Sequence, residues 1–563
     1  MRNNVGFPAK VSSPSAALCH SALGWTRSLF AAQKPTLKKY SVLLSLVFAL
    51  SALPAYASIS NVYVAASASG AANGADCADA YAISFYYTSA NWGTGSGQIG
   101  PGTTVHLCGT FSAAAGASNY LTTQKNGTSG NPITILFEPN AVLTAPYWGG
   151  PAISTSNNYI TINGGTNGTI QATANGTNLA NQNWTGMCFS SSGANNLIVE
   201  NLTCSDIYVH VCNPPITSCT DTSGANGIQV SGGNNISIHN NTVHDAAWAI
   251  VYTIPGSNTE SNVAIYSNSI YNCDHGPTIG DGNTNAILNG GLIYNNAVHD
   301  GGNWDDNSDQ WHHDGIHVFL THSGSSVTGL AIYNNYIYGY WGYHWTAAIY
   351  VEPIPPSNTT SFYIFNNVSI NSQTVGGPAD GYWYFFGNNC GVYNNTAVQG
   401  TASPQNGLRY STNSSASSGC TVENNIFTYP LRGIVIDGSS TLTNSDYNDF
   451  YGLPANNAMY YNAWYGTLAA WIAGTGFDAH SITSNPKLNA NGQPPAGSPV
   501  LGAGANLYSI CNGQANPGLG ALCYDKVGTA RSSSSAWDMG AYQFSSSAED
   551  PPVAPANLTA TVQ

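Results

Sequence analysis

Charge is scarce in this sequence. Asp, Glu, Lys and Arg make up 7% of the 563 residues, against roughly 25% in an average soluble protein. Only 12 residues are Lys or Arg, and 26 are Asp or Glu. We therefore expect no basic surface that could neutralise phosphates, and no nucleic-acid partner. A polyanionic ligand would need locally concentrated positive charge or a bridging cation.

A long apolar run is also missing. The apolar segment Val42–Leu53 follows Lys38 and Lys39 and precedes Ala55-Tyr56-Ala57. This order of charge, apolar run and A-x-A site is that of a secretory signal peptide, and the run is too short to cross a bilayer comfortably. We expect residues 1–57 to be a leader and the mature protein to be secreted or cell-surface attached, without spanning a membrane. A membrane anchor is the alternative.

Cysteines at C-x-x-C spacing are absent, so a zinc ribbon has no support. One of the 12 Cys lies in the predicted leader, which leaves eleven in a compartment that permits disulfides. The local pairs that we favour are Cys77–Cys108, Cys212–Cys219 and Cys511–Cys523.

What the chain has instead is a repeated phrase, Ile or Val, any residue, and then usually Asn-Asn. Successive copies are spaced by 27 to 39 residues, as expected for solenoid coils with loops of variable length. The copies are Ile238-His239-Asn240-Asn241, Ile265-Tyr266-Ser267-Asn268, Ile293-Tyr294-Asn295-Asn296, Ile332-Tyr333-Asn334-Asn335, Ile364-Phe365-Asn366-Asn367, Val392-Tyr393-Asn394-Asn395 and Val422-Glu423-Asn424-Asn425.

The phrase predicts an all-β fold, a right-handed parallel β-helix with asparagine ladders at its turns. The Ile or Val faces the interior and its neighbour faces out. Asn tolerates the left-handed backbone of a sharp corner, and its amide can bond to the Asn of the coils above and below. Asn334 and Asn366 should lie about 4.8 Å apart on neighbouring coils. Cys390 and Cys420 each lie two residues before the Val of their copy of the phrase, so they should occupy the same position on adjacent coils. Their Cα atoms should therefore lie within about 7 Å, bridged or simply stacked.

A second family of strands lies between the copies of the phrase. Its members are Ile228-Gln229-Val230, Ile250-Val251-Tyr252, Ile287-Leu288-Asn289, Ile316-His317-Val318, Ile349-Tyr350-Val351, Trp383-Tyr384-Phe385, Leu408-Arg409-Tyr410 and Ile434-Val435-Ile436. Stacking in register predicts one exterior patch, flanked by Phe319 and Phe386. The patch holds His317, Tyr350, Glu352, Tyr384, Arg409 and Asp437. The alternative is an outer sheet face covered by loops, on which the aromatic rings only pack.

This patch offers acid, base and cation groups beside flat rings that suit sugars. In a lyase, Tyr350 or His317 would take the proton α to a uronate carboxylate, and Arg409 or a loop-bound cation would neutralise that carboxylate. In a glycosidase, Glu352 would be the acid, with Asp314 or Asp437 as its partner. The residues expected to bind substrate are Phe319, Tyr384, Phe386, Asp437 and Trp311.

The polar run from His299 to Asp314 predicts a loop beside the patch. Its carboxylates at Asp305, Asp306 and Asp309 could hold Ca²⁺. The two His with Asp at its end could hold a transition metal instead, and a solvated loop is the alternative. A further column shares one offset from the Asn turn and is interpreted as a turn ladder in which Asp replaces Asn. It consists of Asp206, Asp245, Asn272 and Asp300.

The sequence resembles the secreted pectate-lyase-like parallel β-helix superfamily. The stretches Pro101–Val105, Gly109–Phe111 and Gly127–Ile135 resemble the first coils of chondroitinase-B-like and alginate-lyase-like members. The C-terminal stretch resembles a choice-of-anchor Q module, through Gly497–Val500, Asp525, Gly528, Arg531 and Asp538–Tyr542. Uronate lyases of this fold typically use Lys and Arg, but the helix body has almost no Lys, and Arg409 and Arg432 are the only arginines between the leader and Arg531. The resemblance therefore implies the fold and does not carry over a substrate.

These observations divide the chain into four parts. We expect a leader at 1–57, a β-helix at 58–485, a closing C-terminal module at 486–545 and a Pro-rich linker at 546–563 that resembles the start of a fibronectin type III module. Two functions fit. The first is a carbohydrate-active enzyme, a monomeric lyase or glycosidase acting on an extracellular polysaccharide. The second is a non-catalytic adhesive or carbohydrate-binding protein in which the solenoid is only a rigid rod.

Overall fold

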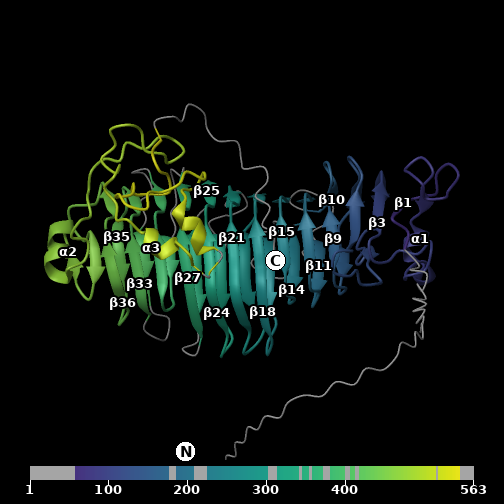
Figure 1. Cartoon of the computed structure of the whole chain (residues 1–563), viewed down its shortest axis with the longest axis horizontal. Coiled ribbons are helices and arrows are strands. Elements are labelled where there is room, and N and C mark those ends of the chain that lie inside the picture. The colour runs from purple at the N-terminus through teal and green to yellow at the C-terminus, as the bar shows by residue number, and fades with distance from the viewer. Residues whose placement is uncertain are drawn as a thin grey trace, which may run out of the picture. The chain divides into compact units, whose positions relative to one another are not determined.

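The chain forms a right-handed parallel β-helix, as the repeated phrase predicted (Figure 1). This computed structural model describes residues 58–175, 185–207, 225–301, 313–341, 345–353, 358–371, 381–399, 406–411, 417–514, 516 and 518–545. Three sheets run the length of the solenoid, with 14, 12 and 13 strands among these residues. A complete coil contributes one strand to each sheet in turn, as β15, β16 and β17 do.

The first sheet carries the Ile-Asn phrase on its strands. It consists of β2 (Tyr81–Ala82), β1 (Asn61–Ala65), β3 (Thr104–Cys108), β6 (Ile133–Phe137), β9 (Ile160–Asn163), β12 (Leu197–Glu200), β15 (Ile236–His239), β18 (Thr259–Tyr266), β21 (Ile287–Tyr294), β24 (Ser326–Tyr333), β27 (Thr359–Phe365), β30 (Cys390–Tyr393), β33 (Ser418–Glu423) and β36 (Thr441–Asp446).

The second sheet follows the asparagine corner and is made of short strands. It consists of β4 (Thr110–Ser112), β7 (Val142–Ala145), β10 (Thr169–Ala172), β13 (Thr203–Ser205), β16 (Thr242–His244), β19 (Ser269–Tyr271), β22 (Ala297–His299), β25 (Tyr336–Gly339), β28 (Val368–Asn371), β31 (Thr396–Val398), β34 (Ile426–Thr428) and β37 (Asp449–Tyr451).

The third sheet closes each coil. It consists of β5 (Leu121–Thr122), β8 (Pro151–Thr155), β11 (Met187–Ser192), β14 (Ile228–Ser231), β17 (Trp248–Ile254), β20 (His275–Asp281), β23 (His313–Leu320), β26 (Trp345–Pro353), β29 (Gly381–Phe385), β32 (Asn406–Tyr410), β35 (Arg432–Ile436), β38 (Met459–Tyr461) and β39 (Trp464–Tyr465). Pairing is parallel from β5 to β38, and β38 pairs with β39 antiparallel.

The two asparagines of the phrase have different tasks. The first takes the left-handed backbone of the corner, as Asn334 (φ 57°) and Asn366 (φ 55°) do, which Asn tolerates better than most residues. The second points inward, and its amide donates to the Asn of the next coil at 2.9–3.0 Å. This asparagine ladder, 0–2% exposed, consists of Asn241, Asn268, Asn296, Asn335, Asn367, Asn395, Asn425 and Asn448.

The register of the first sheet agrees with the prediction. Asn334 and Asn366 follow Tyr333 and Phe365, which are partners on neighbouring strands β24 and β27. The Ile of the phrase stacks from Ile238 through Ile265 and onward as a fully buried interior row. Burying each such side chain stabilises the fold by about 1.5–3 kcal/mol. The column with Asp206 and Asp300 also has left-handed backbone (φ 59° and 54°), which fits its interpretation as a turn ladder.

One member of the predicted second strand family was assigned wrongly. Ile287-Leu288-Asn289 belongs to β21 of the first sheet, where Leu288 pairs with Glu260 and Val327. The strand that takes its place is β20, which pairs with β17 and β23. The sequence of β20 contains Gly276 and Pro277 and few branched apolar residues, so it lacks the composition of a strand. The other members lie in the third sheet in the predicted register.

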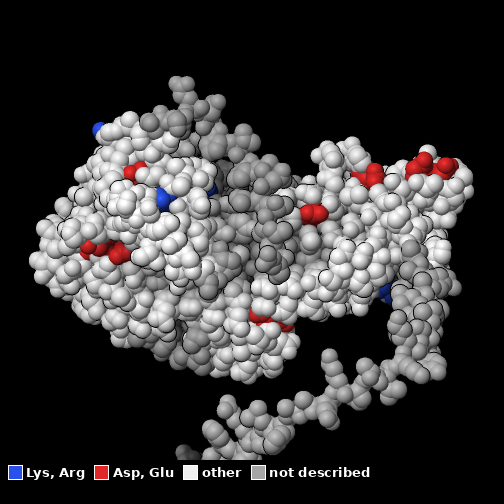
Figure 2. Space-filling model, viewed as in Figure 1, with Lys and Arg blue, Asp and Glu red and all other residues white. Residues whose placement is uncertain are grey.

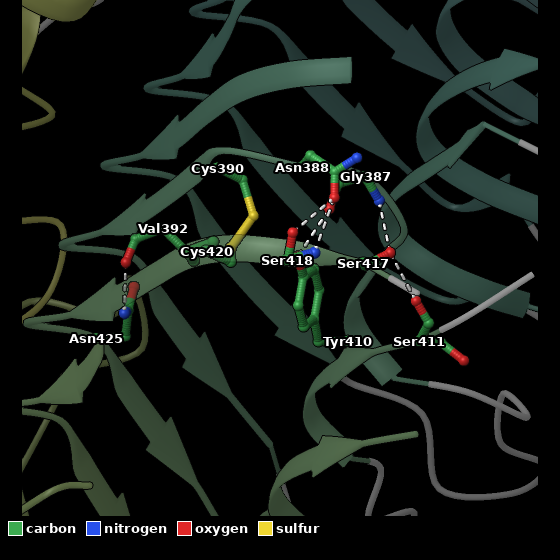
Figure 3. Close-up of a disulfide and its surroundings, with 10 residues drawn as sticks. All are labelled: Gly387, Asn388, Cys390, Val392, Tyr410, Ser411, Ser417, Ser418, Cys420 and Asn425. Atoms are coloured by element: carbon green, nitrogen blue, oxygen red, sulfur yellow. Dashed lines mark hydrogen bonds between the residues drawn. A yellow bond between two sulfur atoms is a disulfide. The ribbon is translucent and has the colours of Figure 1, made fainter. Parts of the chain in front are cut away.

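Four disulfides lie within the described residues, and one of them joins strands of neighbouring coils. The Cα atoms of Cys390 and Cys420 lie 4.3 Å apart, within the predicted reach, and the two residues are bridged rather than only stacked. Figure 3 shows this bridge beside Ser417 and Ser418, which tie the same two coils through Gly387 and Asn388. The predicted pairs Cys77–Cys108 and Cys511–Cys523 are also bridged. Cys188–Cys204 was not anticipated, and the predicted pair Cys212–Cys219 lies outside the described residues.

Helices are short and lie near the two ends of the described chain. They are α1 (Ser84–Tyr87), η1 (Ser89–Asn91), α2 (Leu468–Thr475), α3 (Tyr508–Cys511) and η3 (Leu519–Cys523). None of the helices in these ranges is long and apolar enough to cross a membrane. Figure 2 shows that acidic and basic side chains are few and scattered on the face in view.

The segment after α2 returns along the outside of the first sheet, where its yellow ribbon lies beside β27 in Figure 1. It binds the first asparagines of the corners, because the side chains of Asn366 and Asn424 donate to the backbone carbonyls of Tyr524 and Ala505 at 2.8 and 2.9 Å. Arg531 donates in turn to the Asn366 side chain at 2.9 Å. The side chains at the corners thus provide the docking surface for this segment.

Candidate functional site

A row of stacked rings lies on the outward side of the third sheet, one residue per coil, and its central rings, His317, Tyr350 and Tyr384, are at most 9% exposed. Neighbouring ring centroids lie 4.5, 5.3, 5.0 and 5.0 Å apart, and a guanidinium carbon lies 5.0 Å from the last centroid. We call this set the ring column. It consists of Trp248, His275, His317, Tyr350, Tyr384 and Arg409. The order of its last four members is the predicted one, with His317 and Tyr350 on adjacent coils.

Glu352 lies at the centre of this column. Its carboxylate accepts a hydrogen bond of 2.6 Å from the Tyr350 hydroxyl and lies 3.1 Å from Nε2 of His317. The Glu352 side chain keeps 12% of its surface exposed, whereas that of His317 keeps 4%. Glu352 is therefore the group of this trio that a ligand on the outer face could reach most easily. All three were predicted as catalytic, and the structure brings them together.

A denser acid–histidine cluster lies beside Glu352. Asp274 contacts Nδ1 of His275 at 2.9 Å and also contacts Nδ1 of His313. Oδ2 of Asp314 lies 3.5 Å from Nε2 of His275 and 3.7 Å from Nδ1 of His317. These side chains are at most 5% exposed. The predicted site residue Asp314 thus contacts two histidines of the ring column.

Burial and charge act on these groups in opposite directions. Burial opposes the charged form of Asp274, but His313 and His275 outweigh it and hold the pKa of Asp274 well below its usual range. Burial also opposes charge on His275, but Asp274 outweighs it and raises the pKa of His275 to about 10. For His317, burial prevails and lowers the pKa. Burial, with Glu352 beside the hydroxyl, holds the pKa of Tyr350 far above its usual range. At neutral pH, His317 is neutral and Tyr350 keeps its proton.

The far end of the column carries an ion pair. Nε of Arg409 donates to Asp437 at 2.6 Å, and Ser411 donates to the same carboxylate oxygen at 2.9 Å. Both charged side chains are about one-quarter exposed, at 29% and 25%. Asp437 therefore balances the charge of Arg409.

Two predicted aromatic side chains frame the column. Phe319 packs edge-on against Trp248, with ring centroids 5.6 Å apart, and leans on His317 at 5.3 Å. Phe386 follows β29 and leans on Tyr384 at 4.9 Å. Trp311, Asp305, Asp306 and Asp309 lie outside the described residues. Their predicted roles in substrate and Ca²⁺ binding therefore stay predictions.

Sequence reasoning missed Asp274, His275 and Trp248 as members of the site, and it considered His313 only as a possible transition-metal ligand. Asp274 and His275 were missed because the wrong assignment of Ile287–Asn289 removed β20 from the predicted column. A usable signal was present in the turns. Trp248 follows the left-handed Asp245 by the same three positions by which His275 follows the left-handed Asn272. Counting from the corner would have aligned these two strands, because corners keep the register of a solenoid when the strand composition is unusual.

Comparison with known proteins identifies no family and no function for this chain. No family model and no curated protein matches the sequence. Among solved structures, the chain is similar to pectate lyase Pel9A, at 14% identity and a TM-score of 0.42, over 86% of this chain and 96% of that one. It is also similar to the DFA-IIIase of Arthrobacter chlorophenolicus A6 (11%, TM-score 0.41, 68% and 90%) and to the alginate lyase of Paenibacillus sp. str. FPU-7 (14%, TM-score 0.30, 61% and 91%). The resemblance to chondroitinase-B-like first coils and to a choice-of-anchor Q module has no family match and stays a prediction.

Proposed function

We propose that the protein is a secreted enzyme that cleaves glycosidic bonds of an extracellular polysaccharide on the outer face of the third sheet. The observation that carries this proposal is the environment of Glu352. Its carboxylate, held by Tyr350 and His317, lies in a row of aromatic rings beside the Arg409–Asp437 pair. A fixed carboxyl group beside ring faces is suited to protonate the oxygen of a bound sugar.

Hydrolysis fits this geometry better than elimination for two reasons. The charge of Arg409 is balanced by Asp437, so it adds little net positive charge for a uronate carboxylate. Both ring nitrogens of His317 face carboxylates, Nδ1 toward Asp314 and Nε2 toward Glu352. Neither nitrogen is therefore directed toward a substrate proton, as elimination would require. In hydrolysis, Glu352 would donate the proton to the leaving oxygen, with Asp314 or Asp437 as the second carboxylate.

A lyase is the second candidate, and one observation favours it. His317 is neutral and Tyr350 is protonated at neutral pH, and their rings stack 5.0 Å apart on adjacent coils. A neutral imidazole beside a protonated phenol is a base–acid pair of the kind that β-elimination needs. Such a lyase would still require a cation or Arg409 to stabilise the carbanion that forms next to the carboxylate.

The test is incubation of the mature protein with a panel of neutral and uronate-containing polysaccharides. New reducing ends without the ultraviolet absorbance of an unsaturated sugar would identify a hydrolase, and both signals together would identify a lyase. Glu352→Gln should abolish hydrolysis and Arg409→Ala should abolish elimination. Full activity in both variants would place the catalytic site elsewhere. If no polysaccharide is cleaved or bound, the alternative of a non-catalytic rod is favoured, and the ring column only packs.

A further inference from the structure

Three potential metal ligands converge where Asp314 contacts two histidines of the ring column. They are Nε2 of His275, Oδ2 of Asp314 and Nδ1 of His317, and the three atoms lie within 4.8 Å of one another. They come from two neighbouring strands, β20 and β23. All three side chains are at most 4% exposed. A bound ion would therefore be enclosed by protein atoms rather than by bulk water.

The far side of each ligand is held by a further group. His275 directs Nδ1 to Asp274 at 2.9 Å, and His317 directs Nε2 to Glu352 at 3.1 Å. Metal-binding histidines almost always have such a carboxylate or carbonyl on the second nitrogen, because it fixes the tautomer and the orientation of the ring. The other oxygen of Asp314 accepts a hydrogen bond of 3.1 Å from the backbone N–H of Ala347. Each ligand is thus aimed toward the other two.

We propose that His275, Asp314 and His317 bind one divalent transition-metal ion with the chemistry of Zn²⁺. Bonds of about 2.0–2.2 Å in tetrahedral geometry separate the ligand atoms by about 3.3–3.5 Å. The observed separations from Asp314 are 3.5 and 3.7 Å. The two imidazole planes, now 24° apart in a stack, must tilt toward each other when the ion binds. Two nitrogen ligands favour a transition metal over Ca²⁺, so this site is different from the Ca²⁺ site predicted at Asp305, Asp306 and Asp309.

The cluster holds acidic groups that a metal ion could balance in place of the proton on Nε2 of His275. Asp274, Asp314 and Glu352 bring three carboxyl groups into one buried region. Buried carboxylates are costly unless a proton, a cation or hydrogen bonds compensate them. An ion on Nδ1 of His317 would leave the proton on Nε2, from which it is donated to Glu352. The ion would then act as a positioning group for Glu352 as well as an anchor between two coils.

The experiment measures binding directly and does not depend on the proposed function. Mature protein without a histidine tag is dialysed against a chelator, then titrated with Co²⁺ and Zn²⁺. The absorption bands of Co²⁺ report the ligand geometry, and elemental analysis after gel filtration reports the stoichiometry. We expect about one ion per chain and bands of tetrahedral or five-coordinate Co²⁺ that Zn²⁺ displaces.

Single-residue variants test whether the ion binds at His275, Asp314 and His317. Asp314→Asn keeps an oxygen for the Ala347 N–H and removes the metal-binding carboxylate, so affinity should fall at least a hundredfold. Glu352→Gln removes only the group behind His317 and should lower affinity about 10–100-fold. His480→Ala is the matched control, because His480 contacts one carboxylate, Asp446, and its side chain is 61% exposed. Circular dichroism and the melting temperature check folding, and Glu352→Gln decides the question if Asp314→Asn does not fold.

Three results would overturn the inference. The first is wild-type protein that binds neither Co²⁺ nor Zn²⁺ at millimolar concentration, which would mean that protons alone balance the cluster. The second is stoichiometric binding that both cluster variants retain. The third is binding that His480→Ala weakens as much as Asp314→Asn does, because the ion would then lie outside the cluster.

Discussion

Two buried polar columns run along this solenoid, and they differ in kind. The asparagine ladder repeats one residue on eight successive coils, and the first seven amides each donate to the Asn of the next coil at 2.9–3.0 Å. The ring column changes its residue from coil to coil, from tryptophan through histidine and tyrosine to arginine. Because the same residue repeats, each side-chain amide of the ladder finds a hydrogen-bond partner on the neighbouring coil. The variation instead collects different chemical groups at one place.

This difference distinguishes the residues that stabilise the β-helix from the residues that serve its activity. A neutral ladder stabilises the fold because its hydrogen bonds compensate the cost of burying the amides. Buried carboxylates and imidazoles, such as Asp314 and His317, carry a larger desolvation cost and stabilise less reliably. We therefore expect the ladder to dominate stability and the ring column to dominate activity.

Removing one member of the ladder should have the largest effect on stability. The Asn367 side chain donates to Asn395 and to the backbone carbonyl of Ile332, and accepts from Asn335. Asn367→Ala leaves these buried groups without partners at about 1–3 kcal/mol each, so we expect a loss of about 4–6 kcal/mol. Urea unfolding measures it. The exposed Asn283→Ala should change stability by less than about 0.5 kcal/mol. Equal losses in the two variants would contradict the ladder's role.

The disulfide between neighbouring coils should have the next largest effect. Cys390 and Cys420 close a loop of 30 residues, so replacing both by Ser should lower the free energy of unfolding by about 3 kcal/mol. The pair Cys511 and Cys523, separated by 12 residues, is the control and should cost less. If removing the shorter loop's disulfide lowers the free energy of unfolding more, in the same urea titration, then the entropy of the unfolded chain is not the main source of the disulfides' stabilisation.

A carboxyl group outside both columns gives an effect on stability that depends on pH. Asp449 is fully buried, and neither of its carboxylate oxygens has a hydrogen-bond partner among the described residues. Burial raises its pKa to about 8. The folded state therefore holds this proton more tightly than the unfolded state does, and the protein loses stability as the pH rises from about 4 to about 8.

Asp449→Asn should remove this loss. The variant should match the wild type in stability near pH 4 and exceed it by about 1.4 kcal/mol more for each pH unit up to about pH 8. Melting temperatures across this range measure the difference. A constant difference at all pH values would show that Asp449 ionises normally in the folded protein.

The sequence predicted the parts of this structure that repeat. The phrase at Ile332-Tyr333-Asn334-Asn335 and its copies identified the fold, the register of the first sheet and the Cys390–Cys420 contact, because each copy reports the same local physics. Most of the ring column followed from the same periodicity. Prediction failed where the repeat is interrupted. β20 has a Gly-Pro pair in place of a branched apolar run, so His275 was missed together with its strand.

Contacts between distant segments were also beyond sequence reasoning. Arg531 reaches Asn366 across 165 positions, and no periodicity links the two residues. The acid–histidine cluster depends on Asp274 and Asp314, which a long insertion separates in the chain and the coil brings together. Such contacts depend on loop lengths and on three-dimensional stacking, which local patterns do not encode.

The central claim is that the ring column serves chemistry and the asparagine ladder serves the fold. The most direct test measures activity and melting temperature together for Glu352→Gln, with Glu423→Gln as control, a half-buried glutamate of the first sheet bonded to Asn444. On the polysaccharide that the wild type cleaves, Glu352→Gln should lose at least about a hundredfold in rate, with a melting temperature within a few degrees of the wild type. Glu423→Gln should keep its rate. A fully active Glu352→Gln, or one as destabilised as Asn367→Ala, would contradict the account.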